Sequence, residues 1–130
     1  MLLILLACAE PPTTCSEEAV ASVTVHVLDA DGAPVTADVV SYYLNYDTEV
    51  GNQPVDAECT NADCSEWVAG WDQAGTFDVR AGVYDGPQHE GPGSCSWSGE
   101  GQATVSEAAA GCHVDGHSID IVVADYECLD

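Results

Sequence analysis

Cysteine is the residue type that most constrains how this chain can fold. Seven cysteines occur in its 130 residues, namely Cys8, Cys15, Cys59, Cys64, Cys95, Cys112 and Cys128. Hydrophobic residues make up 46% of the sequence, but much of this fraction is alanine, and Leu, Ile and Phe are scarce beyond the first six residues. A core of small side chains buries little apolar surface, so the fold benefits from covalent crosslinks.

The amino-terminal apolar run predicts export. Leu2–Leu6 is far too short to span a bilayer, which takes about 20 apolar residues, and its abrupt polar ending is typical of a secretory signal. The segment Leu5-Leu6-Ala7-Cys8 resembles a bacterial lipobox, in which the cysteine becomes the lipid-bearing first residue of the mature protein. We therefore expect residues 1–8 to be a signal segment and Cys8 to be lipidated. The alternative is cleavage around Ala7-Cys8-Ala9, which releases a soluble secreted or periplasmic protein.

Either processing route removes Cys8 from the disulfide pool and leaves 7 − 1 = 6 cysteines. An even number in a small exported chain is typical of a disulfide framework. The spacing favours one pairing among several, with Cys59–Cys64 around a polar turn, Cys15–Cys128 near the two ends, and Cys95–Cys112 as the pair that remains.

Alternating β-branched residues predict short strands. Val23, Val25 and Val27 show the period-two pattern of a half-buried strand. Asp29–Pro34 has the composition of a turn, and a second alternating run leads from Val35 towards Tyr43, so we expect these two strands to form a β-hairpin. Further short strands are expected at residues 54–59, 64–70, 75–81, 95–98, 102–106 and 117–124.

The organisation that follows is a single all-β domain over residues 21–130. Many short strands separated by Gly-rich turns predict an antiparallel β-sandwich of about seven strands, stapled by disulfides. Residues 9–20 have no periodicity and suit a flexible tether. Ser106–Ala110 fits one helical turn, and Asp115-Gly116 marks a bulge or tight turn, because the inward parity of the last strand changes there.

Several short motifs resemble a known group of domains. They are Val23-Thr24-Val25, Asp29, Asp31-Gly32, Pro34-Val35, Gly75-Thr76-Phe77-Asp78-Val79, Ala81-Gly82 and Tyr84. These motifs are similar to those of carboxypeptidase regulatory-like domains, which have a transthyretin-like (prealbumin-like) β-sandwich fold. The stretch from Cys59 to Trp67 and the segment Cys112-His113-Val114 also resemble lipoproteins of Gram-negative bacteria. The resemblance implies a non-catalytic module and carries over no catalytic residue.

The charge of the chain excludes several partners. One basic residue, Arg80, stands against 23 Asp and Glu, which gives a formal net charge of −22. Affinity for nucleic acids and for anionic lipids depends on clustered Lys and Arg, so we expect no nucleic-acid partner, and membrane attachment only through lipid on Cys8. Acidic residues such as Asp38, Asp78 and Asp120 are expected to form a solvated coat.

Two metal sites can be considered. Asp29 and Asp31 precede a glycine, as carboxylates do in many calcium loops, but the later ligand positions are filled by alanine and valine. A zinc site would draw on Cys112, His113, His117 and either Cys95 or His89. Exported cysteines are more often oxidised to disulfides than kept as zinc ligands. We therefore expect no resident cofactor, with weak calcium binding as the alternative.

The sequence has no nucleophile elbow, zinc-protease motif or phosphate-binding loop, so we expect no enzymatic activity. Tyr42, Tyr46 and Trp71 are candidates for exposed aromatics that stack on sugar rings or anchor a protein. The predicted function is that of a non-catalytic lipoprotein of the cell envelope, anchored to the outer membrane or cell surface, with a protein or glycan partner. The alternative is a calcium-responsive extracellular adhesion module or a carbohydrate-binding module.

Overall fold

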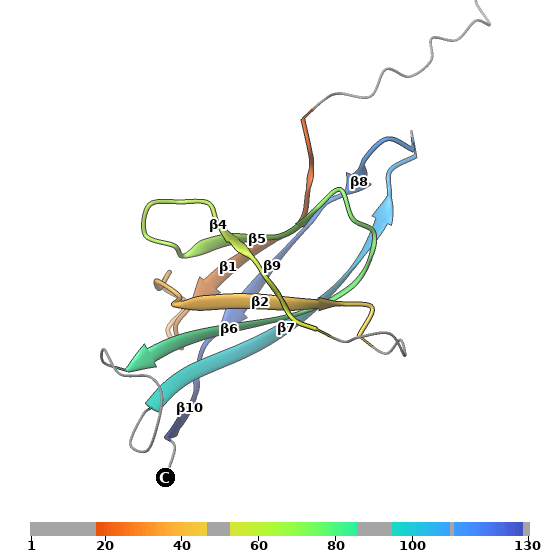
Figure 1. The fold of residues 1–130 in the computed structure, drawn as a ribbon. Coiled ribbons are helices and arrows are strands. Elements are labelled where there is room, and N and C mark those ends of the chain that lie inside the picture. The colour runs from red at the N-terminus through yellow and green to blue at the C-terminus, as the bar shows by residue number, and fades with distance from the viewer. Residues whose placement is uncertain (1–17, 47–52, 86–94, 110, 129–130) are drawn as a thin grey trace, which may run out of the picture.

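The computed structural model describes residues 18–46, 53–85, 95–109 and 111–128. The strands in these ranges are β1 (Ala21–Leu28), β2 (Val39–Leu44), β3 (Val55–Asp56), β4 (Glu58–Cys59), β5 (Glu66–Trp71), β6 (Gly75–Asp85), β7 (Cys95–Glu107), β8 (Val114–Asp115), β9 (His117–Val122) and β10 (Asp125–Cys128). They form two sheets packed together, which confirms the predicted all-β sandwich (Figure 1). The strands outnumber the expected seven because β3, β4 and β8 are separate strands of two residues each.

The first sheet has the strand order β4-β5-β1-β9. Its strand β1 pairs antiparallel with β5 and parallel with β9, so that Val25 lies opposite Trp67 on one side and Ile119 on the other. The sequence predicted an antiparallel sandwich. The structure differs in this pair, because β1 and β9 run parallel. A parallel pair requires a crossover connection. Here the chain passes through β6 and β7 of the second sheet before β9 returns to the first sheet beside β1.

The second sheet has the order β10-β7-β6-β2-β3, and β8 pairs with β7. Every residue of β6 is opposite a residue of β7, so the strands predicted at 95–98 and 102–106 are parts of one long strand. The intervening Gly99 and Gly101 stay in register. A Cβ atom at Gly99 would overlap the carbonyl oxygen of Val122 on β9, so this glycine permits the two sheets to approach each other closely.

The core lies between the two sheets and is built mainly from valine. Val23, Val25 and Val27 of β1 have no exposed surface, and Phe77 and Val79 of β6 join the same cluster from the other sheet. Burying a side chain of this kind contributes roughly 1.5–3 kcal/mol. The period-two pattern of β1 therefore reports its buried face correctly.

β1 and β2 do not form the predicted hairpin, because they belong to different sheets. The turn at Asp29–Pro34 forms, but the chain then crosses to the second sheet, where the Asp38 amide donates to the carbonyl oxygen of Gly82 at 2.8 Å. The burial pattern changes at this crossing. Val40 is buried and Val39 is only half-buried, which is the reverse of the alternation predicted from Val35.

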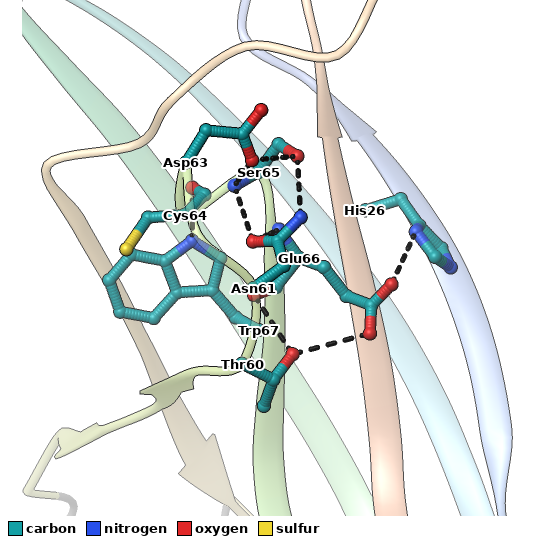
Figure 2. A network of polar contacts seen from close by, with 8 residues as sticks. All are labelled: His26, Thr60, Asn61, Asp63, Cys64, Ser65, Glu66 and Trp67. Carbon is teal, nitrogen blue, oxygen red and sulfur yellow. Dashed lines mark hydrogen bonds and ion pairs between the residues drawn. The ribbon is translucent and has the colours of Figure 1, made fainter.

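The turn between β4 and β5 contains the Cys59–Cys64 disulfide, which confirms that predicted pair. Asn61 closes the turn through its side chain, whose Oδ1 accepts the Ser65 amide at 3.1 Å and whose Nδ2 donates to the Ser65 hydroxyl at 3.0 Å. The indole nitrogen of Trp67 donates to the Cys64 carbonyl oxygen at 2.8 Å. Figure 2 shows these side chains converging on the backbone of the turn, so we interpret this polar cluster as a structural cap.

The other two predicted disulfides, Cys15–Cys128 and Cys95–Cys112, are wrong. Cys95 is bonded to Cys128, because β10 runs antiparallel beside β7 and places these residues opposite each other. Cys112 is also disulfide-bonded, whereas Cys15 lies outside the described residues.

Near the carboxyl terminus the structure confirms the change of parity at Gly116, where β8 ends and β9 begins. Val114 is buried before this point and Ile121 after it. The helical turn predicted from Ser106 is wrong, since residues 106 and 107 continue β7. No segment in the described ranges forms a helix with the length and hydropathy needed to cross a bilayer. The predicted signal segment, with Cys8, and residues 9–17 of the predicted tether lie outside the described residues.

Candidate binding groove

The outer face of the second sheet carries a polar groove. Phe77 and Val79 of β6 point into the core, so the alternating residues Thr76, Asp78 and Arg80 point outward. Neighbouring strands contribute side chains to the same face. Together with Tyr43, Asn45, Tyr46, Glu100 and Gln102, these outward residues line a cavity of about 880 Å³.

Arg80, the only basic residue of the chain, is exposed in this groove. Its guanidinium carbon lies 5.8 Å from the centre of the Tyr43 ring, which is a cation–π contact. Glu100 lies opposite it in the β6–β7 pairing, yet within the described part of the chain the Arg80 guanidinium makes no ion pair. Because the guanidinium makes no ion pair among the described residues, its N–H groups can donate to a ligand.

Two tyrosines form the aromatic part of the groove. The rings of Tyr43 and Tyr46 are 4.8 Å apart in an edge-to-face arrangement, and 47% of Tyr46 is exposed. Asn45 between them has a positive φ of 55°. Its amide donates to the Thr76 carbonyl oxygen at 2.8 Å, and its Oδ1 accepts the Thr76 amide at 3.0 Å. Asn45 thereby fixes the end of β2 against β6 and turns the chain so that Tyr46 stands beside Tyr43.

Cross-strand hydrogen bonds hold the polar floor of the groove. Gln102 Nε2 donates to Asp78 Oδ1 at 2.7 Å, and the hydroxyls of Thr76 and Thr104 are 3.2 Å apart. These bonds orient the side chains before a ligand arrives, which lowers the entropy lost on binding. The groove therefore offers aligned donors and acceptors beside two aromatic rings.

The structure places the predicted aromatic residues in three different environments. Tyr46 lines the groove. Tyr42 is a core residue rather than a surface one, since it is only 6% exposed and its ring is 5.3 Å from that of Phe77. Trp71 is exposed but lies on β5 of the other sheet, where its indole nitrogen donates to Glu58 Oε1 at 3.0 Å.

Sequence reasoning missed Tyr43 and Arg80 as site residues. Both carried a signal. If Tyr42 is buried, Tyr43 must point to the opposite face of its strand, and Arg80 is three residues from the buried Phe77, an odd spacing that places it outward. The charge count singled out Arg80 as the one cation, but only the sheet order shows that it meets Tyr43.

The calcium candidates have other roles in the structure. Oδ1 of Asp29 accepts the amides of Asp31 at 2.9 Å and of Ala33 at 3.0 Å, so this carboxylate caps its own turn. Asp31 is exposed beside it. Across the described ranges, no group of three or more His, Cys, Asp or Glu side chains is arranged to hold a metal ion.

The zinc candidates do not converge. Cys95 and Cys112 are both disulfide-bonded and so do not supply thiolates. Nδ1 of His113 is 2.9 Å from Oδ1 of Asp72, a partly buried contact between the segment after β7 and the turn after β5. His117 is exposed at the start of β9, and His89 lies outside the described residues.

No protein-family model, curated protein or solved structure matches this chain.

Proposed function

We propose that this protein is a non-catalytic binding module of the cell envelope, which recognises a neutral saccharide in the groove on the outer face of its second sheet. The observation that carries the proposal is the placement of Arg80, which makes a cation–π contact with Tyr43 and is free of ion pairs among the described residues in an open polar groove. A guanidinium that makes no ion pair keeps its N–H donors for the oxygens of a ligand.

Saccharides suit this arrangement because they present two kinds of surface. Their C–H faces pack on aromatic rings, here those of Tyr43 and Tyr46, while their hydroxyls require closely spaced donors and acceptors. Arg80, Asp78 and Gln102 supply such groups on one floor. The groove also contains Glu100, so its carboxylates outnumber its cation and disfavour an anionic ligand.

Attachment to the envelope is the second part of the proposal. Leu5-Leu6-Ala7-Cys8 resembles a lipobox. A protein with a net charge of −22 is repelled by an anionic membrane, so lipid on Cys8 would hold the domain there. The resemblance to carboxypeptidase regulatory-like domains supports a non-catalytic role, because such domains are mainly non-catalytic modules.

Calorimetric titration of the mature protein with a panel of neutral oligosaccharides tests the saccharide site. We expect Tyr43→Ala to weaken binding about tenfold, equivalent to ~1.4 kcal/mol, and Arg80→Gln to weaken it by a similar factor. Trp71→Ala removes an exposed aromatic from the other sheet and serves as the matched control. Binding that is unchanged in both groove variants, or absent from the whole panel, would contradict the proposal.

The anchor is tested separately by mass spectrometry of the mature protein. The proposal predicts a mature chain that begins at Cys8 and carries acyl groups. An unmodified chain beginning at Ala9 or Glu10 would favour a soluble protein, and this result would leave the saccharide site to be judged by its own titration.

A further inference from the structure

A second cavity, with different chemistry, lies at the end of the sandwich where β1 ends and β7 begins. Its volume is about 370 Å³. Most of its wall is apolar and consists of Val35, Val83, Trp97, Val123 and Ala124. It shares no lining residue with the groove. The groove is lined by residues of β6 between Thr76 and Arg80, whereas β6 contributes Val83 to this cavity.

The aromatic wall of this cavity is held in place by the β7–β10 pairing. Trp97 and Tyr126 lie opposite each other across the two strands, and their rings are 4.6 Å apart (Figure 1 shows β10 beside the start of β7). The Cys95–Cys128 disulfide joins the same strands two residues away, on the same face of the ladder. Of these two residues only Trp97 lines the cavity, and it is 36% exposed, so its ring is available to a ligand without rearrangement of the core.

Carboxylates stand at one side of the apolar wall. Asp29 and Asp31 both line the cavity. The Asp29 carboxylate is fixed there by the backbone amides that it accepts from Asp31 and Ala33. Tryptophan faces and carboxylates attract the same kind of ligand group, a cation. The strong negative charge of the whole chain acts in the same direction.

The apolar wall decides which cation fits. A primary ammonium ion requires hydrogen-bond acceptors when it leaves water, and Val35, Val83 and Val123 offer none through their side chains. A quaternary ammonium ion has no N–H group and a surface of methyl groups, so it loses little when it contacts valine and gains from the aromatic face. A cavity of this size also accommodates such a group, since small-ligand pockets are typically about 300–1,000 Å³.

We propose that this cavity binds a trimethylammonium group, packed against Trp97 and attracted by Asp29 and Asp31. The group can belong to a small molecule such as choline or to the headgroup of a zwitterionic lipid. The chemistry of recognition is the same in both cases. This site is independent of the saccharide groove.

The decisive experiment compares choline with its uncharged isostere 3,3-dimethylbutan-1-ol, using calorimetry or tryptophan fluorescence on the full, unmutated chain. We expect choline to bind about tenfold more tightly than the isostere, and the difference to shrink in high salt. Equal affinities would show a merely hydrophobic cavity and overturn the proposal, as would failure of choline to bind at about 10 mM.

Variants locate the binding to this cavity. Trp97→Leu keeps an apolar wall but removes the aromatic face, and should weaken choline binding about three- to tenfold. Trp71→Leu, at an exposed position of the other sheet, should have no effect. Asp31→Asn should weaken binding about twofold to threefold. An unchanged affinity in Trp97→Leu would overturn the assignment.

The source of the group is distinguished with phosphatidylcholine vesicles and a Cys8→Ser chain, which cannot be lipidated. Retention on these vesicles that is lost in Trp97→Leu would identify a lipid headgroup, whereas binding of free choline alone would identify a small molecule. Absence of both signals would overturn the proposal.

Discussion

Cys95 and Cys128 occupy opposite positions on β7 and β10, with their Cα atoms 4.0 Å apart, and their disulfide closes the last pair of that ladder. β10 is an edge strand, and all four of its residues are exposed. Its pairing with β7 therefore depends more on this covalent bond and the neighbouring Trp97–Tyr126 contact than on core packing.

The two described disulfides should differ in their effect on stability. Cys95 and Cys128 are 33 residues apart and Cys59 and Cys64 are 5 apart. In the loop-entropy picture the longer loop contributes about 4 kcal/mol and the shorter about 2 kcal/mol. We therefore expect the Cys95→Ala/Cys128→Ala double variant to lose more unfolding free energy in urea than Cys59→Ala/Cys64→Ala. Equal losses in the two double variants would contradict the loop-entropy explanation.

The partner of Cys112 can be predicted by elimination. Four of the seven cysteines are paired with each other, and Cys112 is disulfide-bonded, which leaves Cys8 and Cys15. If Cys8 carries lipid, as we propose, Cys15 must be the partner. Mass spectrometry of an unreduced digest should find a peptide that links Cys15 to Cys112. A link from Cys8 to Cys112 would contradict both this pairing and the lipid anchor.

Sequence periodicity predicted the buried face of a strand better than it predicted the strand's neighbours. Val23, Val25 and Val27 were recognisable as core residues because alternation is a local property. The assignment of β1 and β2 to different sheets depends on a crossing at residues 35–38, where the Ala37 and Asp38 amides donate to the distant carbonyl oxygens of Cys64 and Gly82. The same limit applies to Cys95, since only the position of β10 brings Cys128 opposite it.

The candidate groove shows this limit at the level of single side chains. Tyr43 and Arg80 are 37 positions apart in the sequence, and they meet because β2 pairs with β6 in one particular register. A shift of that register by one residue would turn Arg80 or Tyr43 to the other face. The sequence shows that a tyrosine and an arginine are present, but it does not show that their side chains are in contact.

Close approach of the sheets at Gly99 makes a steric prediction. A Cβ atom at this position overlaps the backbone carbonyl of Val122, which cannot move without disturbing β9. We expect Gly99→Ala to destabilise the fold by about 2 kcal/mol or more in urea unfolding. At Gly101 the nearest atoms are side-chain carbons of Ile119 and Ile121 at 3.2 Å, which can shift. Gly101→Ala is thus the matched control, and a loss equal to that of Gly99→Ala would refute the steric explanation.

Burial of Tyr42 predicts a loss of stability at alkaline pH. Desolvation raises the pKa of the Tyr42 phenol above its ordinary value of 10.0. The folded state thus prefers the neutral phenol, and this contribution is complete below pH 10 and is lost as pH rises through the raised pKa. We expect Tyr42→Phe, which keeps the contact with Phe77, to lose less stability than the wild type between about pH 8 and pH 11. Tyr46→Phe, at an exposed position, should follow the wild type, and identical pH profiles for all three proteins would contradict the prediction.

The net charge of −22 predicts that salt stabilises the fold. Many carboxylates are exposed, including Asp38, Asp56, Asp120 and Glu127, and they repel one another more in the compact state than in the unfolded chain. The range of this repulsion is about 30 Å at 0.01 M salt and about 10 Å at 0.1 M salt. We therefore expect the melting temperature to rise steadily with sodium chloride over this range. Calcium chloride at the same ionic strength is the control, because an additional rise would indicate calcium binding beyond simple screening. A melting temperature that is independent of salt would show that repulsion between the exposed carboxylates does not lower the stability of the folded state.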